Sequence, residues 1–218
     1  FNNKIFCFST ITSMIIMLSM VGPALLIPLY VQNALGLSAL LSGLVIMPGA
    51  IINGIMSVFT GKFYDKYGPR PLIFTGFILL ISCTFLLCFL KVDTSYTYLI
   101  VIYAIRMFAV SLLMMPINTT GINALKTEDI SHGTAIMNFG RVMAGSLGTA
   151  LMVTFMSIGA QWVVSSSEHA SKEMIQRQSV AVGVDVSFAL VTVFVIIAFV
   201  LALFIKEPNH LTHNSRKV

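Results

Sequence analysis

The sequence at residues 61–70 is Gly-Lys-Phe-Tyr-Asp-Lys-Tyr-Gly-Pro-Arg, a charged segment between two long apolar runs. An aspartate lies at its centre, three cations flank the aspartate, and two glycines bracket the group. Nothing else in the first ninety residues concentrates charge in this way. Because Lys and Arg gather in short loops on the cytoplasmic side of membrane proteins, we expect this segment to form a loop at the cytoplasmic surface.

The composition is that of a bilayer protein. Of the 218 residues, 57% are hydrophobic and only 10% are charged, and the mean hydropathy is +0.92. A soluble domain carries about 25% charged residues. The net charge of +5 comes from cations in scattered short segments rather than from a basic stripe. We therefore interpret these cations as topology signals and predict no nucleic-acid partner.

Six apolar runs are long enough to cross a hydrocarbon core of about 30 Å. We predict an all-α membrane protein with transmembrane helices at about residues 6–30, 39–59, 71–90, 96–119, 134–158 and 186–205. Residues 1–208 then form one six-helix bundle, and residues 209–218 form a polar cytoplasmic tail. The long loop at residues 161–185 is expected on the outer face, with a short amphipathic helix at residues 168–178. The chain begins without Met, so we expect it to be a piece of a longer polypeptide.

Both ends of the chain are expected on the inner side of the cytoplasmic membrane. With residues 61–70 inside, the inner segments hold eight cations and the outer segments hold three. The inner cations are Lys4, Lys62, Lys66, Arg70, Lys126, Lys206, Arg216 and Lys217, and the outer ones are Lys91, Lys172 and Arg177. This bias agrees with the positive-inside rule and orients all six helices.

The sequence predicts neither a metal site nor a catalytic centre. Cys7, Cys83 and Cys88 lie inside apolar runs without the spacing of paired ligands, and we interpret them as core or lipid-facing residues. His169 and Glu173 stand four residues apart, but two ligands without a third make a weak site, and a solvated helix face is favoured. The chain also lacks a phosphate-binding Gly-Lys-Ser/Thr loop and the HExxH and GxSxG motifs of membrane hydrolases.

Arg106 is the first of two cations inside the predicted helices. It lies about ten residues, or roughly 15 Å, from the outer end of the fourth helix, near the bilayer midplane. A charge there costs at least about 2.5 kcal/mol, so the side chain should face a cavity or a partner. Two interpretations stay open. Arg106 lies beside a translocation path, or it bonds to neighbouring carbonyl groups and only fixes helix packing.

Arg141 is the second cation inside the predicted helices, and Asn138 and Gly145 lie on its face of the fifth helix. Small residues repeat on an adjoining face of that helix and on the second helix; the two sets are Gly140, Ala144 and Gly148, and Ala50, Gly54, Ser57 and Gly61. Such stripes let another backbone come close. They serve either static packing within the bundle or a sliding interface with another unit.

Methionines line the first and fourth helices at Met14, Met17, Met20, Met114 and Met115, and Asn118 adds a polar group at the inner end of the fourth. Met side chains suit a pocket that repacks around different ligands, and they are also common core filler, so both interpretations stay open. No Asp or Glu lies in the central part of a predicted helix. A proton-coupled transporter ordinarily needs such a carboxylate, so we expect the proton carrier outside this segment.

Residues 61–70 resemble the loop motif of the major facilitator superfamily, G-x-x-x-D-(R/K)-x-G-(x)-(R/K). The matching residues are Gly61, Asp65, Lys66, Gly68 and Arg70, between a second and a third helix as in that family. Arg106, with Ile102 four residues earlier, resembles the helix-four Arg motif of the family, although Ala109 and Val110 replace its Gln and Gly.

Residues 138–141, Asn-Phe-Gly-Arg, followed by Gly145 and Gly148, resemble a helix of the 14-helix drug:H+ antiporters of the EmrB/QacA type. The resemblance implies the C-terminal six-helix half, with 3+3 helix repeats, of a carrier that exports lipophilic drug-like molecules against protons. It implies a proton gradient as driving force, no cofactor, and the N-terminal half of the same polypeptide as partner. The first and fourth helices would line a central cavity, and the second and fifth would meet the other half.

Two alternatives to drug efflux stay open. A facilitator-family importer or uniporter of a small nutrient would need a few fixed polar contacts, which the Met-rich helices disfavour. A membrane scaffold without transport activity would leave Arg106 without a purpose.

Overall fold

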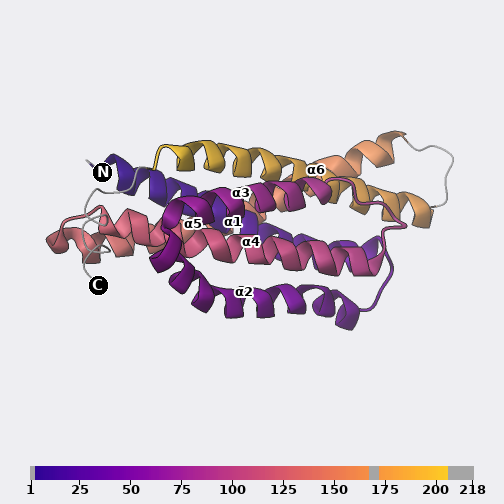
Figure 1. Cartoon of the computed structure of the whole chain (residues 1–218). Helices are drawn as coiled ribbons and strands as arrows, with labels where there is room; N and C mark the ends of the chain where they lie inside the picture. Colours follow the sequence, from indigo (N-terminus) through magenta and orange to yellow (C-terminus); the bar gives the residue numbers. More distant parts are fainter. Residues whose placement is uncertain (1–2, 167–171, 206–218) are drawn as a thin grey trace.

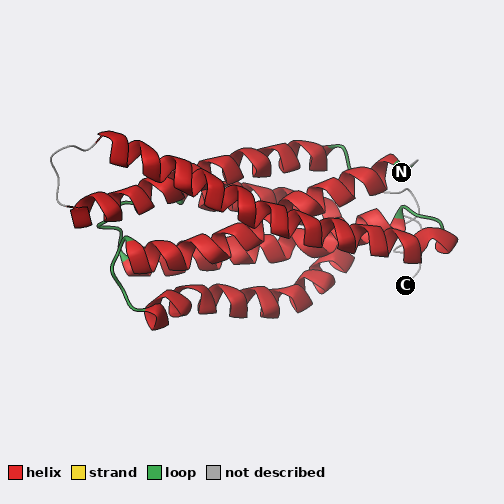
Figure 2. Cartoon of the chain, turned by 180° about the vertical axis from the view of Figure 1, so that it is seen from behind, coloured by secondary structure: helices red, strands yellow, loops and turns green. Residues whose placement is uncertain are grey.

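The computed structural model describes residues 3–166 and 172–205, and all regular structure in these residues is helical. The elements are α1 (Lys4–Asn33), α2 (Ala39–Tyr67), α3 (Pro69–Leu86), α4 (Tyr96–Asn123), the short 3-10 helix η1 (Thr127–Asp129), α5 (Ile130–Ser166) and α6 (Lys172–Leu203). By length and composition, six helices in this part of the chain can cross a membrane. Figures 1 and 2 show them as one elongated bundle of adjacent helices.

The first three helices, α1–α3, and the last three, α4–α6, form two related sets. Helix α1 packs against α5 and α6, and its counterpart α4 packs against α2 and α3. The central helices α1 and α4 contact each other, and so do α3 and α6. Exchanging the first three helices for the last three therefore reproduces most of the contacts. Since three spans separate each pair, paired helices cross in opposite directions, as in the inverted 3+3 repeats of half a transporter.

The two ends of the described bundle lie on the same side. Figure 1 shows α1 (indigo) beginning and α6 (yellow) ending at the end of the bundle where α2 joins α3. This is the end at which the charged residues 61–70 lie.

The predicted loop at residues 61–70 is mostly helix. Residues 61–67 form the last two turns of α2, Pro69 begins α3, and Gly68 is the single residue between the two helices. Gly68 has φ 78° and ψ 174°, a backbone region that is essentially reserved for glycine. Aromatic and cationic side chains stabilise the helical turns, because the Phe63 and Tyr67 rings stack with centroids 6.3 Å apart and Lys62 lies 5.8 Å from the centroid of the Phe59 ring.

The prediction of a long outer loop at residues 161–185 is wrong at both ends. Residues 161–166 continue α5, and residues 172–185 are the first turns of α6, so part of the predicted short helix at 168–178 belongs to α6. Residues 167–171 and the predicted tail at 209–218 lie outside the described residues. Hydropathy identifies the part of a helix that lies in hydrocarbon, whereas these two helices continue as polar turns beyond it. Helix α1 continues through its two prolines, Pro23 and Pro28.

The core has two layers along the bundle. Near the Gly68 end, Phe77, Leu80, Leu113 and Val195 are fully buried in one cluster. Toward the other end, residues such as Tyr30, Leu87, Leu99 and Phe188 form the second cluster. Burial is uneven between helices: in the most apolar window of α4 61% of the residues are buried, against only 17% in that of α2. Helix α2 therefore presents most of its surface to lipid or to another protein segment.

Glycines allow α5 and α6 to approach each other closely. A Cβ atom added at Gly159 would lie 2.8 Å from the Cα of Gly183 and 3.2 Å from the carbonyl oxygen of Val182. These are backbone atoms of the neighbouring helix, which a side-chain rotation cannot move away.

We expect Gly159→Ala to lower the free energy of unfolding by about 1–3 kcal/mol, the usual cost of overpacking. The matched control is Gly43→Ala on α2, where the added Cβ meets nothing within 4 Å and helix propensity gains up to about 1 kcal/mol. Thermal unfolding in detergent measures both. Equal melting temperatures for the two variants would contradict the close α5–α6 contact.

Candidate functional site

Arg106 lies in the middle of α4 with its side chain fully buried. Its Nη2 donates to the carbonyl oxygen of Ser19 on α1, and its Nε donates to the hydroxyl of Thr84 on α3 at 3.4 Å. Nη1 has no hydrogen-bond partner among the described residues. Arg106 therefore joins three helices inside the bundle.

The Ser19 carbonyl is available because of a proline one turn later. In an α-helix this carbonyl accepts from the N–H of residue 23, and residue 23 is Pro, which has no N–H. An unsatisfied carbonyl in hydrocarbon is costly, and a cation without a partner is more so. The contact between Arg106 and Ser19 gives the free carbonyl a donor and the buried cation an acceptor. The sequence signal for it, an intramembrane Pro on a helix next to an intramembrane Arg, was present at Pro23.

Of the two possibilities expected for Arg106, a cavity or a partner, this bundle shows the partner, since none of the side chain is exposed. Its contacts are those of the alternative interpretation, bonds to a neighbouring carbonyl and hydroxyl.

The predicted cavity residues of α1 and α4 are half-buried. Asn118 accepts a 3.0 Å hydrogen bond from the Ser13 hydroxyl, which links α4 to α1. Met17 lies beside Gly145 of α5, and the Met115 methyl is 3.2 Å from a Cβ added at Gly61 of α2. Met20 and Met114 pack against the buried core clusters. The Met side chains thus serve partly as core filler and partly as contacts from the two central helices to α2 and α5.

The motif residues of the α2–α3 junction are mostly exposed. Asp65, Lys66 and Arg70 are exposed, and Gly61 and Gly68 are half-buried. Asp65 has no hydrogen bond or ion pair with another described residue. At the tip of the least buried helix, its carboxylate is free to contact a group outside this bundle.

Most of the small residues of α5 face α1 of the same bundle. A Cβ added at Gly140, Gly145 or Gly148 would meet Met14, Val21 or Leu18 of α1 at 3.4 Å or less. Ala144 is buried, Arg141 is half-buried, and Asn138 is exposed. The glycines and Ala144 bring α5 close to α1 of the same bundle, and the half–half interface stays a prediction. The stripe of α2 differs, since Ala50, Gly54 and Ser57 are exposed.

Asp185 has a role that the sequence did not reveal. The predicted sixth helix begins only at residue 186, whereas Asp185 lies well inside α6, where its Oδ1 accepts a 3.0 Å hydrogen bond from the Leu90 N–H. The Tyr30 hydroxyl of α1 donates to the carbonyl of Lys91, the next residue. The turn between α3 and α4 is thus held from α6 and from α1.

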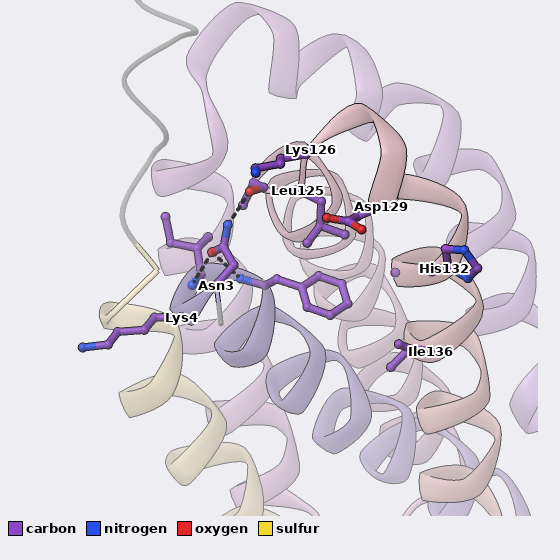
Figure 3. Close-up of a pocket in the computed structure, with 11 residues that line it drawn as sticks. Asn3, Lys4, Leu125, Lys126, Asp129, His132 and Ile136 are labelled. Carbon is purple, nitrogen blue, oxygen red and sulfur yellow. Dashed lines mark hydrogen bonds between the residues drawn. The ribbon is translucent and has the colours of Figure 1, made fainter. Parts of the chain in front are cut away.

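A cavity of about 700 Å³ lies at the opposite end, between the start of α1, the α4–α5 connection and the start of α5. Figure 3 shows Asn3 beside the α4–α5 connection, with Asp129 and His132 on η1 and α5. The Asn3 side chain accepts from the Ile5 N–H and donates to the Ala124 carbonyl. This contact fastens the first turn of α1 to the end of α4. The described residues contain no cluster of three metal-ligating side chains.

We expect Asp185→Ala to release the α3–α4 turn, because the Leu90 N–H loses its acceptor. Asp185→Asn is the matched control, since the amide oxygen can still accept. Hydrogen–deuterium exchange at residues 88–94 should rise in the alanine variant and stay near the wild-type rate in the asparagine variant. Unchanged exchange in both variants would mean that Asp185 does not hold this turn.

Comparison with known proteins agrees with this architecture. The family model described as Major Facilitator Superfamily matches residues 1–149. The Lincomycin resistance protein LmrB of Listeria monocytogenes is 35% identical over 209 residues, which cover 96% of this chain and 44% of that protein. LmrB of Bacillus subtilis is 34% identical over 95% of this chain and 43% of its own length.

A third relative, the Multidrug export protein EmrB of Escherichia coli, is 29% identical over 134 residues, which cover 61% of this chain and 26% of that protein. The chain spans less than half the length of these relatives. The chain has six membrane-length helices in two related sets of three, and Gly68 connects α2 to α3. It belongs to the Major Facilitator Superfamily, a family of multi-pass membrane transporters.

Proposed function

We propose that the protein exports lipophilic drug-like molecules across the cytoplasmic membrane in exchange for protons, by alternating access. The observation that carries this proposal is the 35% identity to a lincomycin resistance protein over 96% of the chain. The likeness to a multidrug export protein points in the same direction. Because the chain spans under half of these relatives, we propose that it works together with a second six-helix bundle of the same polypeptide.

The surface of α2 supports such a second bundle. Its exposed face carries a stripe of large apolar residues, among them Met47, Ile51, Ile55 and Val58, beside the exposed small residues Ala50, Gly54 and Ser57. Small residues in such a stripe allow close approach and sliding of another helix. The unpaired Asp65 at the end of α2 would meet a helix N-terminus of the second bundle when the inner side is closed, which is a favourable anion–dipole contact.

We place both ends of the described chain on the cytoplasmic side. The α2–α3 junction with Lys62, Lys66 and Arg70 lies at the same end as the start of α1 and the end of α6. Cations concentrate on the cytoplasmic side of membrane proteins.

The proton carrier is proposed to lie in the second bundle. Among the Asp and Glu residues whose side-chain burial the structure describes, only Asp185 is not exposed, and its carboxylate holds the Leu90 N–H of the turn between α3 and α4. A carboxylate that carries protons must lose and regain its proton without releasing a structural contact, so Asp185 fits a positioning role better.

Cells that express the full-length protein should accumulate several-fold less of a lipophilic antibiotic such as lincomycin than cells without it. A proton uncoupler should abolish the difference, because the gradient supplies the driving force. The measurement is intracellular accumulation of labelled drug. Efflux that persists after uncoupling would refute proton coupling, and saturable uptake of one nutrient instead of efflux would favour an importer.

We expect Arg106→Met to impair transport while leaving the fold intact. The substitution leaves the Ser19 carbonyl unpaired, at a cost of about 1–3 kcal/mol. It also removes an intramembrane charge, whose burial itself costs at least about 2.5 kcal/mol. The two effects nearly cancel in the free energy of unfolding, whereas the three-helix connection is lost. Transport rate and melting temperature, measured on the same preparations, separate the two.

Thr84→Val is the matched control, because it removes only the 3.4 Å contact to Nε and keeps the bond to Ser19. It should reduce transport less than Arg106→Met does. Full transport by Arg106→Met at a normal membrane level would show that Arg106 has no part in the cycle.

A further inference from the structure

A groove runs between α3 and α6 on a face of the bundle that α1, α2 and α5 do not line. Its volume is about 420 Å³, and its lining is apolar except for Arg70 at the start of α3. Phe74 of α3 and Phe199 of α6 form part of its wall, with ring centroids 5.7 Å apart. Leu203, in the last turn of α6, lines the same groove.

The groove opens toward lipid. Both of its helices are long and apolar enough to cross a membrane, and the wall residues Phe74 and Leu203 are 50% and 60% exposed. Arg70 lies two residues after Gly68, at the end of the bundle where α3 begins and α6 ends. Its guanidinium is therefore at the level of the membrane surface, with the apolar part of the groove extending from it along Phe74 and Phe199.

The charge of Arg70 is not neutralised within the bundle. Its side chain is exposed, and it has no hydrogen bond or ion pair with any described residue. A guanidinium prefers a bidentate phosphate or carboxylate partner. A single cation at the surface end of an apolar groove is complementary to a molecule with an anionic head and a hydrocarbon chain.

We propose that the α3–α6 groove binds one anionic phospholipid from the leaflet at the Gly68 end. Arg70 pairs with the headgroup, and an acyl chain lies along Phe74, Phe199 and Leu203. The site is separate from the proposed transport function, because the face of α2 and the contacts of Arg106 belong to other parts of the bundle. A positive charge near the membrane surface contributes about fivefold to the binding of an anionic over a zwitterionic lipid.

The experiment measures lipid retained by the purified full-length protein in detergent, with native mass spectrometry, after equal loading with phosphatidylglycerol and phosphatidylcholine. Wild-type protein should retain phosphatidylglycerol about fivefold better. Arg70→Gln should abolish this preference. Leu203→Trp should reduce retention of both lipids, because the larger ring fills the groove while Arg70 remains.

Two control variants make the test specific. Lys62→Gln removes one exposed charge at the same end of the bundle but on α2, and Val193→Trp adds the same ring at an exposed position of α6 ten residues from Leu203. Both should retain lipid as the wild type does. An equal loss for Arg70→Gln and Lys62→Gln would reduce the effect to general surface attraction and overturn the site.

Two further outcomes also decide the proposal. Retention that is unchanged in Leu203→Trp would exclude an acyl chain in the groove. Displacement of the lipid by millimolar glycerol phosphate would indicate a site for a soluble anion rather than for a lipid. Because retention is measured without transport, failure of this proposal leaves drug efflux untouched, and the reverse also holds.

Discussion

The contact between Arg106 and the carbonyl oxygen of Ser19 connects the two central helices, α1 and α4, inside the membrane. A bilayer offers no water to satisfy a polar group, so every exposed carbonyl and every intramembrane charge must find a protein partner. Pro23 removes the helical donor of the Ser19 carbonyl, and Arg106 supplies another from α4. Each group would be costly alone, and together they join the two central helices, with Thr84 attaching α3 to the same point.

The two halves of the internal repeat use this framework differently. Helix α5 is drawn against α1 by Gly140, Gly145 and Gly148 and also packs closely on α6 through Gly159. Its counterpart α2 packs mainly on α4 and exposes most of its apolar surface. One outer helix is thus fixed to the core by glycines, whereas the other keeps its small residues on the outside. Because of this asymmetry, the α5 side of the bundle is packed against its own helices, whereas the α2 side can contact another protein segment.

Helix number, membrane class and the family motif could be read from the sequence, because each rests on a local signal. Six long apolar runs give six spans, and the spacing of Gly61, Asp65 and Gly68 gives the corner between α2 and α3. Helix ends could not be read in the same way, since the mixed polar and apolar residues at 161–166 and 172–185 give no clear hydropathy signal. The direction in which a small-residue stripe faces was also undetermined, because the stripes of α2 and α5 have similar spacing, and only tertiary packing distinguishes them. Arg106 shows the same limit: its depth followed from its position in the helix, and its partner followed from a proline eighty-three residues away.

The single-residue connection at Gly68 has a mechanical consequence. Consecutive Cα atoms are about 3.8 Å apart, so the last turn of α2 and the first turn of α3 can never separate by more than two such steps. Helix α2 can swivel about this joint but cannot slide lengthwise without taking α3 with it. Because α3 is bound to α4 and α6, any displacement of the tip of α2 is converted into a tilt, and the far end of the helix moves the most.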